Sequence, residues 1–396
     1  MRIAFFTNCY KPLINGVVSS IVSLKESLEK KGHETFIFAP RMEAYQDEES
    51  NIFRYHSINL THKVKYPVAI PLSLRAGQVI NKFKPDIIHL HHPFVLSLPA
   101  IMYAAKLKIP KVLTIHTQYE RYAYYVSPIP HIITHEAIRR IIFNLSDKVD
   151  IITTPSQSMK DLILNYKIKK EITVIPNAID ISIFQNINRQ EVELLKKELH
   201  ITPDDVVIIY VGRVSLEKNI DKIIKALALI RNKKIDNFVF IVVGEGTAVK
   251  KLNSLADSLK LREKVRFVGA IAREMVRYYY QIGDIFAFSS TSETFGMVII
   301  ESLASGLPVL AVKAPGAVDI IQDGFDGILV EDDVSQFAEQ LENLIQNKDL
   351  RKKLSLNGLK TVQRYSIEVV SDQVLALYGR LLSDKSKTTD HVSPHH

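Results

Sequence analysis

Two cations in the second half of the chain could bind a diphosphate. Arg213 and Lys218 stand on one loop, directly after the apolar run Val206–Val211 and before an amphipathic helix. Cations at the end of a buried strand can neutralise a diphosphate and stabilise it as a leaving group. Taken alone, the loop could equally be a surface loop whose charges pair with nearby acids.

Two glutamates further along the chain, Glu293 and Glu301, stand eight residues apart around a Thr-Phe-Gly turn. Gly296 is expected to open a helix, whose free amides would bind phosphate oxygens. Glu293 would accept hydrogen bonds from sugar hydroxyls, and Glu301 would reach a ribose diol. Either glutamate alone is more often a helix-dipole partner or a solvated residue, but the pair is much more specific. The other residues expected to bind here are Thr294, Phe295, Gly296, Met297 and Val298.

A weaker phosphate-binding candidate is Asn15-Gly16, between the first predicted strand, Arg2–Thr7, and the first helix, Val17–Lys31. A glycine there lets the backbone approach a phosphate or a sugar closely. The three spaced glycines of a dinucleotide-binding domain are absent, which counts against an NAD site.

Histidines and tyrosines follow two further predicted strands, Ile87–His91 and Val112–His116. We expect this part of the first domain to hold the acceptor. Three histidines between residues 89 and 92 could suggest a metal site, but their spacing also fits a strand end with one packed and one exposed histidine. The candidate acceptor-binding residues are His91, His92, Phe94, Tyr119, Glu120 and Tyr122.

The elements that must position these residues alternate between short apolar runs and amphipathic helices, which is typical of a parallel α/β sheet. Two successive cycles, joined near Ile175–Asp180, predict two Rossmann-like, doubly wound domains that face each other across a cleft, with ligands beyond the carboxyl ends of the strands. The expected domains are residues 1–176, to which a helix at about 366–383 can return, and residues 177–365. Residues 384–396 are expected to form a disordered tail.

The bulk composition is that of a globular protein with two domains. The chain has 396 residues, a net charge of +8 and a single cysteine, so no intrachain disulfide can form. All of the excess charge lies in residues 1–180, and residues 52–111 hold nine basic side chains and one acid. Such an asymmetry points to an anionic partner, unless it is a solvated face. No signal peptide or membrane span is predicted, so a cytoplasmic protein is expected.

Taken together, these motifs resemble those of the large retaining glycosyltransferase family 4, which has the GT-B fold. The features that carry the resemblance are Asn15-Gly16, Ile115-His116, Ile175–Asp180, Val211–Arg213 with Lys218, Val243–Gly246, Glu293–Glu301 and Gly306–Pro308. The resemblance implies that Arg213, Lys218 and Glu293 act on the sugar diphosphate, together with His116 as a sugar contact from the first domain. It also implies that Gly212, Gly244 and the backbone near Val268 help to hold the donor.

The His-Pro-Phe run and the His-Thr-x-Tyr-Glu-x-Tyr run resemble those of bacterial enzymes that glucosylate diacylglycerol. The resemblance implies transfer of glucose from UDP-glucose to a lipid acceptor. The basic region 52–111 contains the apolar run Tyr66–Leu74. This region is expected to dock on the anionic inner face of the cell membrane. Alternatively, Val68–Leu74 packs in the core.

Two alternatives to a lipid acceptor stay open at this point. One is a transferase that acts on a soluble sugar or a polysaccharide. The other is a nucleic-acid-binding protein, which the absence of a recognition motif disfavours. No cofactor is expected, and no metal either, because no Asp-x-Asp pair stands on a suitable loop.

Overall fold

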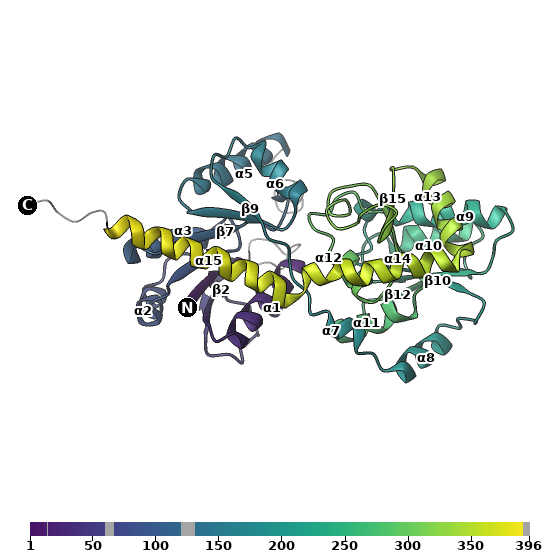
Figure 1. Cartoon of the computed structure of the whole chain (residues 1–396), viewed down its shortest axis with the longest axis horizontal. Coiled ribbons are helices and arrows are strands. Elements are labelled where there is room, and N and C mark those ends of the chain that lie inside the picture. The colour runs from purple at the N-terminus through teal and green to yellow at the C-terminus, as the bar shows by residue number, and fades with distance from the viewer. Residues whose placement is uncertain (14, 60–66, 120–130, 391–396) are drawn as a thin grey trace, which may run out of the picture. The chain divides into compact units, whose positions relative to one another are not determined.

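The computed structural model describes residues 1–13, 15–59, 67–119 and 131–390 (Figure 1). The chain forms two compact units, Met1–Ala178 with Ile367–His396 and Ile179–Ser366. Each unit is built on a parallel sheet flanked by helices, so the predicted fold class of two Rossmann-like α/β domains is confirmed.

Unit 1 contains a seven-stranded parallel sheet with the order β3-β2-β1-β6-β7-β8-β9. Its strands are β1 (Arg2–Phe6), β2 (Glu34–Pro40), β3 (Ile52–Tyr55), β6 (Ile87–Leu90), β7 (Lys111–Thr114), β8 (Ile151–Thr154) and β9 (Ile172–Val174). A separate antiparallel pair joins β4 (Ser57–Asn59) to β5 (Pro67–Ala69). The strand order changes direction between the neighbours β1 and β6. Open α/β sheets bind ligands at such a topological switch point.

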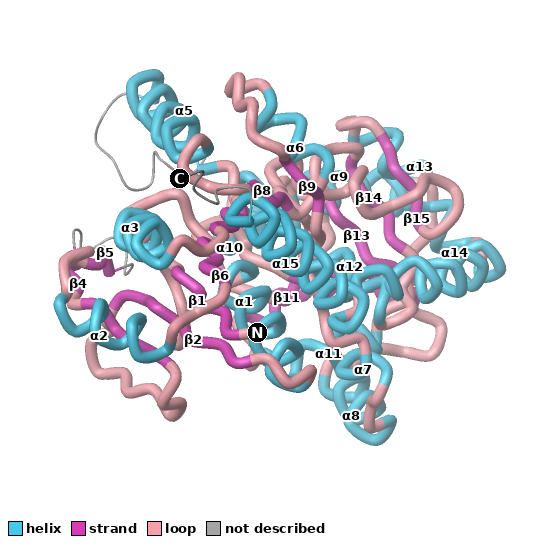
Figure 2. Tube along the Cα trace, turned by 60° about the vertical axis from the view of Figure 1, so that its left-hand side comes forward, coloured by secondary structure: helices cyan, strands magenta, loops and turns pink. Residues whose placement is uncertain are grey.

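The helices of unit 1 cover both faces of its sheet because neighbouring residues of each strand point in opposite directions. Ile3 and Phe5 of β1 pack with α1 (Gly16–Lys30) and α15 (Ile367–Asp390). Ala4 and Phe6 pack on the other face with α2 (Leu74–Phe83), α3 (Ser97–Leu107), α5 (His131–Ser146) and α6 (Gln157–Leu164). Figure 2 shows α15 beside α1, where Ser27 Oγ donates a hydrogen bond to Ser371 Oγ over 2.9 Å.

Unit 2 contains a six-stranded parallel sheet with the order β12-β11-β10-β13-β14-β15. Its strands are β10 (Val206–Val211), β11 (Phe238–Val243), β12 (Val265–Gly269), β13 (Ile285–Phe288), β14 (Val309–Val312) and β15 (Gly327–Val330). Every residue of β10 and β11 is buried, which explains their unbroken apolar sequences.

The helices of unit 2 are α7 (Ser182–Gln185), α8 (Arg189–Glu198), α9 (Ile220–Asn232), α10 (Val249–Ser258), α11 (Arg273–Ile282), α12 (Met297–Ala304), α13 (Val334–Gln346) and α14 (Lys348–Thr361). Several begin at a capping side chain. For example, Asp333 accepts a hydrogen bond from the Gln336 amide at the start of α13.

The structure corrects one expectation for the end of the chain. Residues 384–396 were expected to form a disordered tail, but α15 continues to Asp390. Neither glycine nor proline interrupts residues 381–390, so a polar composition alone does not end the helix. The edge strand β3 and the pair β4–β5 were not predicted. No helix among the described residues is long and apolar enough to cross a membrane.

Candidate functional site

The two donor-side motifs of unit 2 meet because β10 and β13 are neighbours in a parallel sheet. Their following loops therefore leave the sheet at the same edge. Lys218 lies in the short 3-10 helix Leu216–Lys218, and its side chain is only 11% exposed. Its Nζ forms an ion pair with Oε1 of Glu293 from the loop after β13. The structure thus brings together two residues that the sequence assigned to one site.

Hydrogen bonds join the loop after β10 to the loop after β13. Ser289 Oγ lies 3.0 Å from the carbonyl oxygen of Lys218 and 2.9 Å from that of Asn219. Asn219 Nδ2 in turn donates to the Ser289 carbonyl over 3.3 Å and to Thr291 Oγ1 over 3.4 Å. Lys218 is therefore held at its backbone and at its ammonium group. Ser289 and Asn219 were not predicted from the sequence, because their role depends on contacts across about 70 residues of chain.

Arg213 is the exposed cation of the same edge. Its backbone carbonyl accepts a hydrogen bond from Tyr210 Oη over 3.1 Å, whereas its guanidinium has no hydrogen bond or ion pair with any described residue. The loop that carries Arg213 packs tightly on the loop after β11. A Cβ on Gly244 would lie 1.9 Å from the Gly212 carbonyl oxygen, so only glycine fits there.

Helix α12 begins at the same edge. Gly296 precedes it with φ 59° and ψ 52°, a left-handed conformation that favours glycine. The Ile299 amide closes the first turn on the Gly296 carbonyl over 2.9 Å. Phe295 is buried, while Thr294, Met297 and Val298 are half-buried. Gly316, on which a Cβ would lie 2.7 Å from Glu293 Cβ, was not predicted from the sequence. Gly316 therefore makes room for the carboxylate that pairs with Lys218.

Glu301 lies one turn into α12 and faces a partner that the sequence did not predict. Tyr280 Oη of α11 donates to Glu301 Oε2 over 2.8 Å. Burial raises the pKa of Glu301, while Tyr280 and the charge of Arg273 act in the opposite direction. The expected contact of Glu301 with a ribose diol stays a prediction. Val268 lies half-buried in β12, beside Gly269, whose carbonyl accepts from the Gly244 amide over 2.9 Å.

In unit 1 the predicted phosphate loop ends in a helix cap. Asn15 Oδ1 accepts a hydrogen bond from the Val18 amide over 2.9 Å, and Gly16 is the first residue of α1. The Asn15 side chain therefore caps α1. The exposed Gly16 backbone is the part of this motif that a ligand can approach.

The histidines of unit 1 form a buried stack. His89 Nδ1 lies 2.6 Å from Tyr378 Oη of α15, and its Nε2 lies 2.6 Å from Thr114 Oγ1. The His89 ring stacks on His91 with centroids 4.2 Å apart, and His91 Nδ1 lies 3.1 Å from His116 Nε2. The expectation of one packed and one exposed histidine is wrong, because His89, His91 and His92 are all buried.

The stack consists of neutral imidazoles. Burial lowers the pKa of His89 to about 3 and that of His116 to about 4, and it lowers the pKa of His91 well below its ordinary value. The Asn177 side chain beside His116 acts in the opposite direction. Both ring nitrogens of His116 are withdrawn from solvent, so a hydrogen bond from its ring to a sugar would require the imidazole to rotate.

The fourth buried histidine, His92, lies on the loop after β6 and contacts the loop after β1. Its Nδ1 accepts a hydrogen bond from the Asn8 amide over 3.2 Å, so the proton of the neutral ring is on Nε2, 3.5 Å from Cys9 Sγ. Burial lowers the pKa of His92 to about 3 and raises that of the Cys9 thiol to about 11. The thiol is therefore protonated at neutral pH and is a poor nucleophile.

The remaining acceptor candidates lie close to this stack or outside the described residues. Phe94 and Tyr119 pack edge to face with ring centroids 4.7 Å apart. Glu120 and Tyr122 lie outside the described residues. Within the described ranges, no three His, Cys, Asp or Glu side chains are grouped as metal ligands.

Comparisons with known proteins identify the family of the chain. Residues 191–361 match the family of glycosyl transferases group 1, and residues 14–183 match glycosyltransferase family 4. The chain is 33% identical to an alpha-monoglucosyldiacylglycerol synthase of Streptococcus pneumoniae, over 89% of this chain and 80% of that protein. It is 30% identical to the synthase of the same name from Acholeplasma laidlawii, over 98% and 99%. The solved structure of HepE from Anabaena with UDP and glucose has a TM-score of 0.75 at 19% identity, over 96% of this chain and 100% of that one.

The buried histidines predict that acid destabilises the fold. In the unfolded chain these histidines bind protons with pKa values of about 6.5, whereas in the folded chain they do so only at far lower pH. Unfolding therefore takes up protons, and the free energy of unfolding should fall as the pH drops from about 7 toward 4, by up to about 1.4 kcal/mol per pH unit for each histidine. Urea unfolding between pH 5 and 7.5 measures this slope.

A pair of variants isolates the contribution of one ring. His92→Gln should make the slope shallower, whereas His200→Asn, a change at an exposed residue, should leave it unchanged. Equal slopes for the wild type and His92→Gln would contradict the assignment of His92 as neutral in the folded protein.

Proposed function

The chain belongs to glycosyltransferase family 4, and we propose that it transfers glucose from UDP-glucose to diacylglycerol at the inner surface of the cell membrane. As a member of this family it is a retaining glycosyltransferase that depends on a nucleotide sugar. The ion pair between Lys218 and Glu293, beside Arg213 and the start of α12, is the observation that supports the reaction most directly.

Unit 2 would bind the sugar diphosphate and stabilise it as it leaves. Arg213 and the amides at the start of α12 would contact phosphate oxygens, and Lys218 would neutralise charge that develops on the departing diphosphate. Glu293 uses Oε1 to hold Lys218, and Oε2 has no hydrogen bond with the described residues. This second oxygen can accept a hydrogen bond from a sugar hydroxyl, which would orient the anomeric carbon.

Unit 1 would bind the acceptor. The residues proposed for this role are His91, His92, Phe94, Tyr119, Glu120 and Tyr122, with His116 as a sugar contact. Phe94 and Tyr119 are half-buried and present aromatic surface near the ends of β6 and β7. Apolar aromatic surface can pack against an acyl chain. The similarity to two alpha-monoglucosyldiacylglycerol synthases supports a lipid acceptor.

Exposed apolar side chains on unit 1 support a membrane-bound reaction. Leu72 and Leu74 are 85% and 91% exposed, and Met102 of α3 is 69% exposed. The segment around Leu72 and Leu74 therefore does not pack fully in the core, although Ala69 before it does. Helices α2 and α3 are neighbours, because a Cβ on Gly77 would lie 3.6 Å from the Tyr103 hydroxyl.

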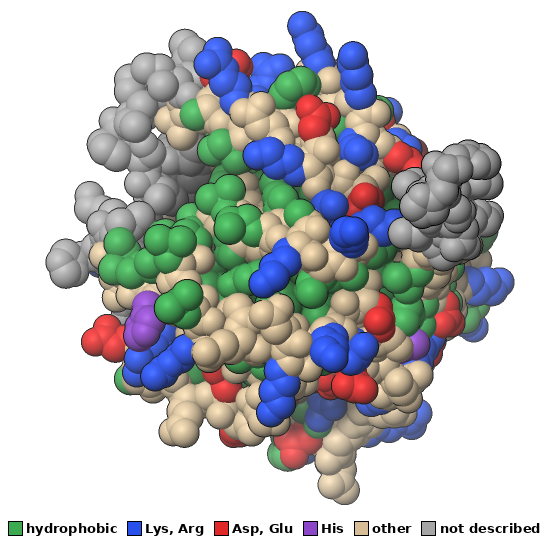
Figure 3. Space-filling model, turned by 90° about the vertical axis from the view of Figure 1, so that its left-hand side faces the viewer, with side chains coloured by type: hydrophobic (Ala, Val, Ile, Leu, Met, Phe, Trp, Pro, Cys, Tyr) green, Lys and Arg blue, Asp and Glu red, His purple; other side chains and the backbone are tan. Residues whose placement is uncertain are grey.

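Cations accompany this apolar surface. Of the basic residues between 52 and 111, Arg54 and Lys111 are paired with Asp47 and Asp150, and residues 63 and 65 lie outside the described ranges. The exposed ones are Arg75, Lys82, Lys84, Lys106 and Lys108. Figure 3 shows a face on which hydrophobic side chains gather among Lys and Arg side chains. Such a surface suits anionic headgroups, at about 1 kcal/mol for each basic residue near them.

A panel of donors and acceptors tests the proposed reaction. UDP-glucose, UDP-galactose and GDP-mannose are each offered with diacylglycerol or with free sugars, with and without EDTA. We expect an α-linked glucosyl lipid from UDP-glucose and diacylglycerol, identified by mass and by NMR of the anomeric proton, and no loss of rate in EDTA. Transfer to a free sugar but not to the lipid would favour the soluble-acceptor alternative, and binding of DNA without any transfer would favour the nucleic-acid alternative.

The cations of unit 2 make a second prediction. Arg213→Ala and Lys218→Ala should each lower kcat/KM about 100-fold, because the loss of one preorganised donor to the leaving group costs about 3 kcal/mol. Lys222→Ala removes a nearby lysine that pairs with Asp332 outside the motif, and it should leave the rate nearly unchanged. Near-normal turnover in both motif variants, with folding verified by circular dichroism, would refute the site.

The membrane surface makes a third prediction. Leu72→Gln with Leu74→Gln should reduce binding to vesicles that contain anionic lipid by at least about tenfold, since two leucines lose apolar burial. The matched control changes two exposed leucines of unit 2, Leu194→Gln with Leu356→Gln. Binding of the wild type should weaken as salt rises. Equal binding to neutral and anionic vesicles would argue against this docking surface.

A further inference from the structure

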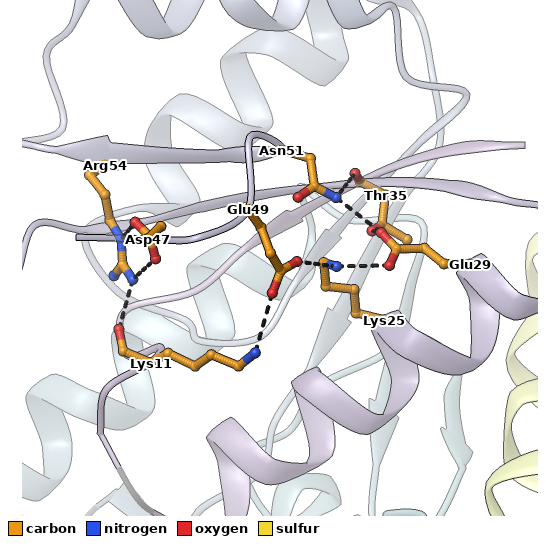
Figure 4. A network of polar contacts seen from close by, with 8 residues as sticks. All are labelled: Lys11, Lys25, Glu29, Thr35, Asp47, Glu49, Asn51 and Arg54. Atoms are coloured by element: carbon orange, nitrogen blue, oxygen red, sulfur yellow. Dashed lines mark hydrogen bonds and ion pairs between the residues drawn. The ribbon is translucent and has the colours of Figure 1, made fainter. Parts of the chain in front are cut away.

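A network of charged side chains in unit 1 surrounds the loop that follows β1. It consists of Lys11, Lys25, Glu29, Asp47, Glu49 and Arg54, with Thr35 and Asn51 at its edge (Figure 4). Three cations and three carboxylates make it neutral. These residues come from the loop after β1, from α1, from β3 and from residues 41–51, so the network connects segments that lie apart in the sequence.

Arg54 of β3 is the centre of the first half of this network. Its Nε and Nη2 donate to the two oxygens of Asp47 over 2.8 and 2.6 Å. Its remaining bonds run to backbone, from Nη1 to the Pro40 carbonyl over 2.8 Å and from Nη2 to the Lys11 carbonyl over 2.7 Å. Arg54 therefore satisfies four hydrogen bonds at once, with its side chain only 13% exposed. Only a planar guanidinium can make them together.

Two aromatic rings lie beside this guanidinium. The Tyr10 and Tyr45 rings have their centroids 5.6 and 5.7 Å from the Arg54 Cζ, within range of a cation–π contact. Tyr10 is buried and directly precedes Lys11, so Arg54 contacts two consecutive residues of the loop after β1.

The second half of the network holds the side chain of Lys11. Its Nζ lies 3.2 Å from Glu49 Oε1, and Glu49 Oε2 lies 2.5 Å from the Nζ of buried Lys25. Burial acts to raise the pKa of Glu49, but hydrogen bonds from Lys25 and Lys11 outweigh it and hold the pKa below its usual range. Lys11 is thus held at its carbonyl by Arg54 and at its ammonium by Glu49 (Figure 4).

The held loop leads directly into the predicted phosphate contact. Four residues after Lys11, Asn15 caps α1, and the exposed backbone of Gly16 follows. Lys11 and the Asn15 cap are therefore both held in place, shortly before the exposed Gly16. We propose that Arg54 is a positioning residue for the nucleotide sugar, which acts by fixing the Lys11 backbone and with it the loop that presents Gly16. This inference rests on the proposed function and on the prediction from the sequence that Asn15-Gly16 contacts the donor phosphate.

The test compares Arg54→Lys with the wild type in transfer from UDP-glucose. Lysine keeps the charge but cannot make the four bonds, so kcat/KM for the donor should fall about tenfold while KM for the acceptor stays unchanged. The binding of UDP-glucose, measured by calorimetry, should weaken, whereas the binding of UMP, which lacks the second phosphate and the glucosyl group, should not.

Two further variants separate positioning from a general loss of stability. Asn51→Ala removes hydrogen bonds to Glu29 and to the Thr35 carbonyl in the same network, but it does not touch Lys11. It should lower the melting temperature without changing the donor kinetics. Asp47→Asn keeps an oxygen acceptor for Arg54 and should lower kcat/KM by only about threefold, so it serves if Arg54→Lys does not fold.

The outcomes distinguish this inference from the proposed function. If the wild type transfers no sugar from any nucleotide donor, the proposed function fails. If the wild type is active and both Arg54→Lys and Asp47→Asn match Asn51→Ala in donor kinetics, Arg54 is only a structural residue and the inference is overturned. Equal losses of UMP and UDP-glucose binding would also overturn it.

Discussion

The ion pair between Lys218 and Glu293 is the constraint on which the proposed donor site depends. It joins two loops that lie 75 residues apart in the sequence, and it can form because β10 and β13 end at the same edge of the sheet. A largely buried ammonium without a partner would be costly, and the carboxylate offsets that cost while it fixes the position of the nitrogen. A diphosphate that arrives at this edge therefore meets a cation that is already oriented and partly desolvated, which is the condition under which a charge stabilises a leaving group best.

The two units use charge near their strand ends in different ways. In unit 2, Arg213 is exposed and has no partner among the described residues, so its charge is available to a ligand. In unit 1, the hydrogen bonds of the Arg54 guanidinium go to Asp47 and to the backbone carbonyls of Lys11 and Pro40. The surplus positive charge of unit 1 therefore does not lie in this network, which is neutral. It lies on exposed positions such as Arg75 and Lys106 of α2 and α3.

The sequence predicts the positions of site residues well where they directly follow a parallel strand. Arg213 and Glu293 follow apolar runs, and residues that follow parallel strands collect at one edge of a sheet. Prediction stops where the partner depends on packing. Tyr280 reaches Glu301 from another helix, and Gly316 makes space for Glu293, yet neither spacing nor residue type reveals these contacts. The edge strand β3 was missed because it has only four residues, and three of them are only half-buried.

The buried histidine stack has a consequence for the chemistry that follows from charge alone. A glycosyl transfer passes through a transition state with positive charge on the sugar ring, and an imidazolium about 5 Å away would oppose it by roughly 3 kcal/mol at an effective dielectric constant near 20. Burial keeps His91 and His116 neutral at physiological pH, so the proposed sugar contact adds no positive charge. Tyr378 of α15 shares in this arrangement through its hydrogen bond to His89. The C-terminal helix thus helps to maintain an uncharged interior beside β6 and β7, the strands of the proposed acceptor site, while the cations proposed to attract an anionic surface lie on the outside of the same unit.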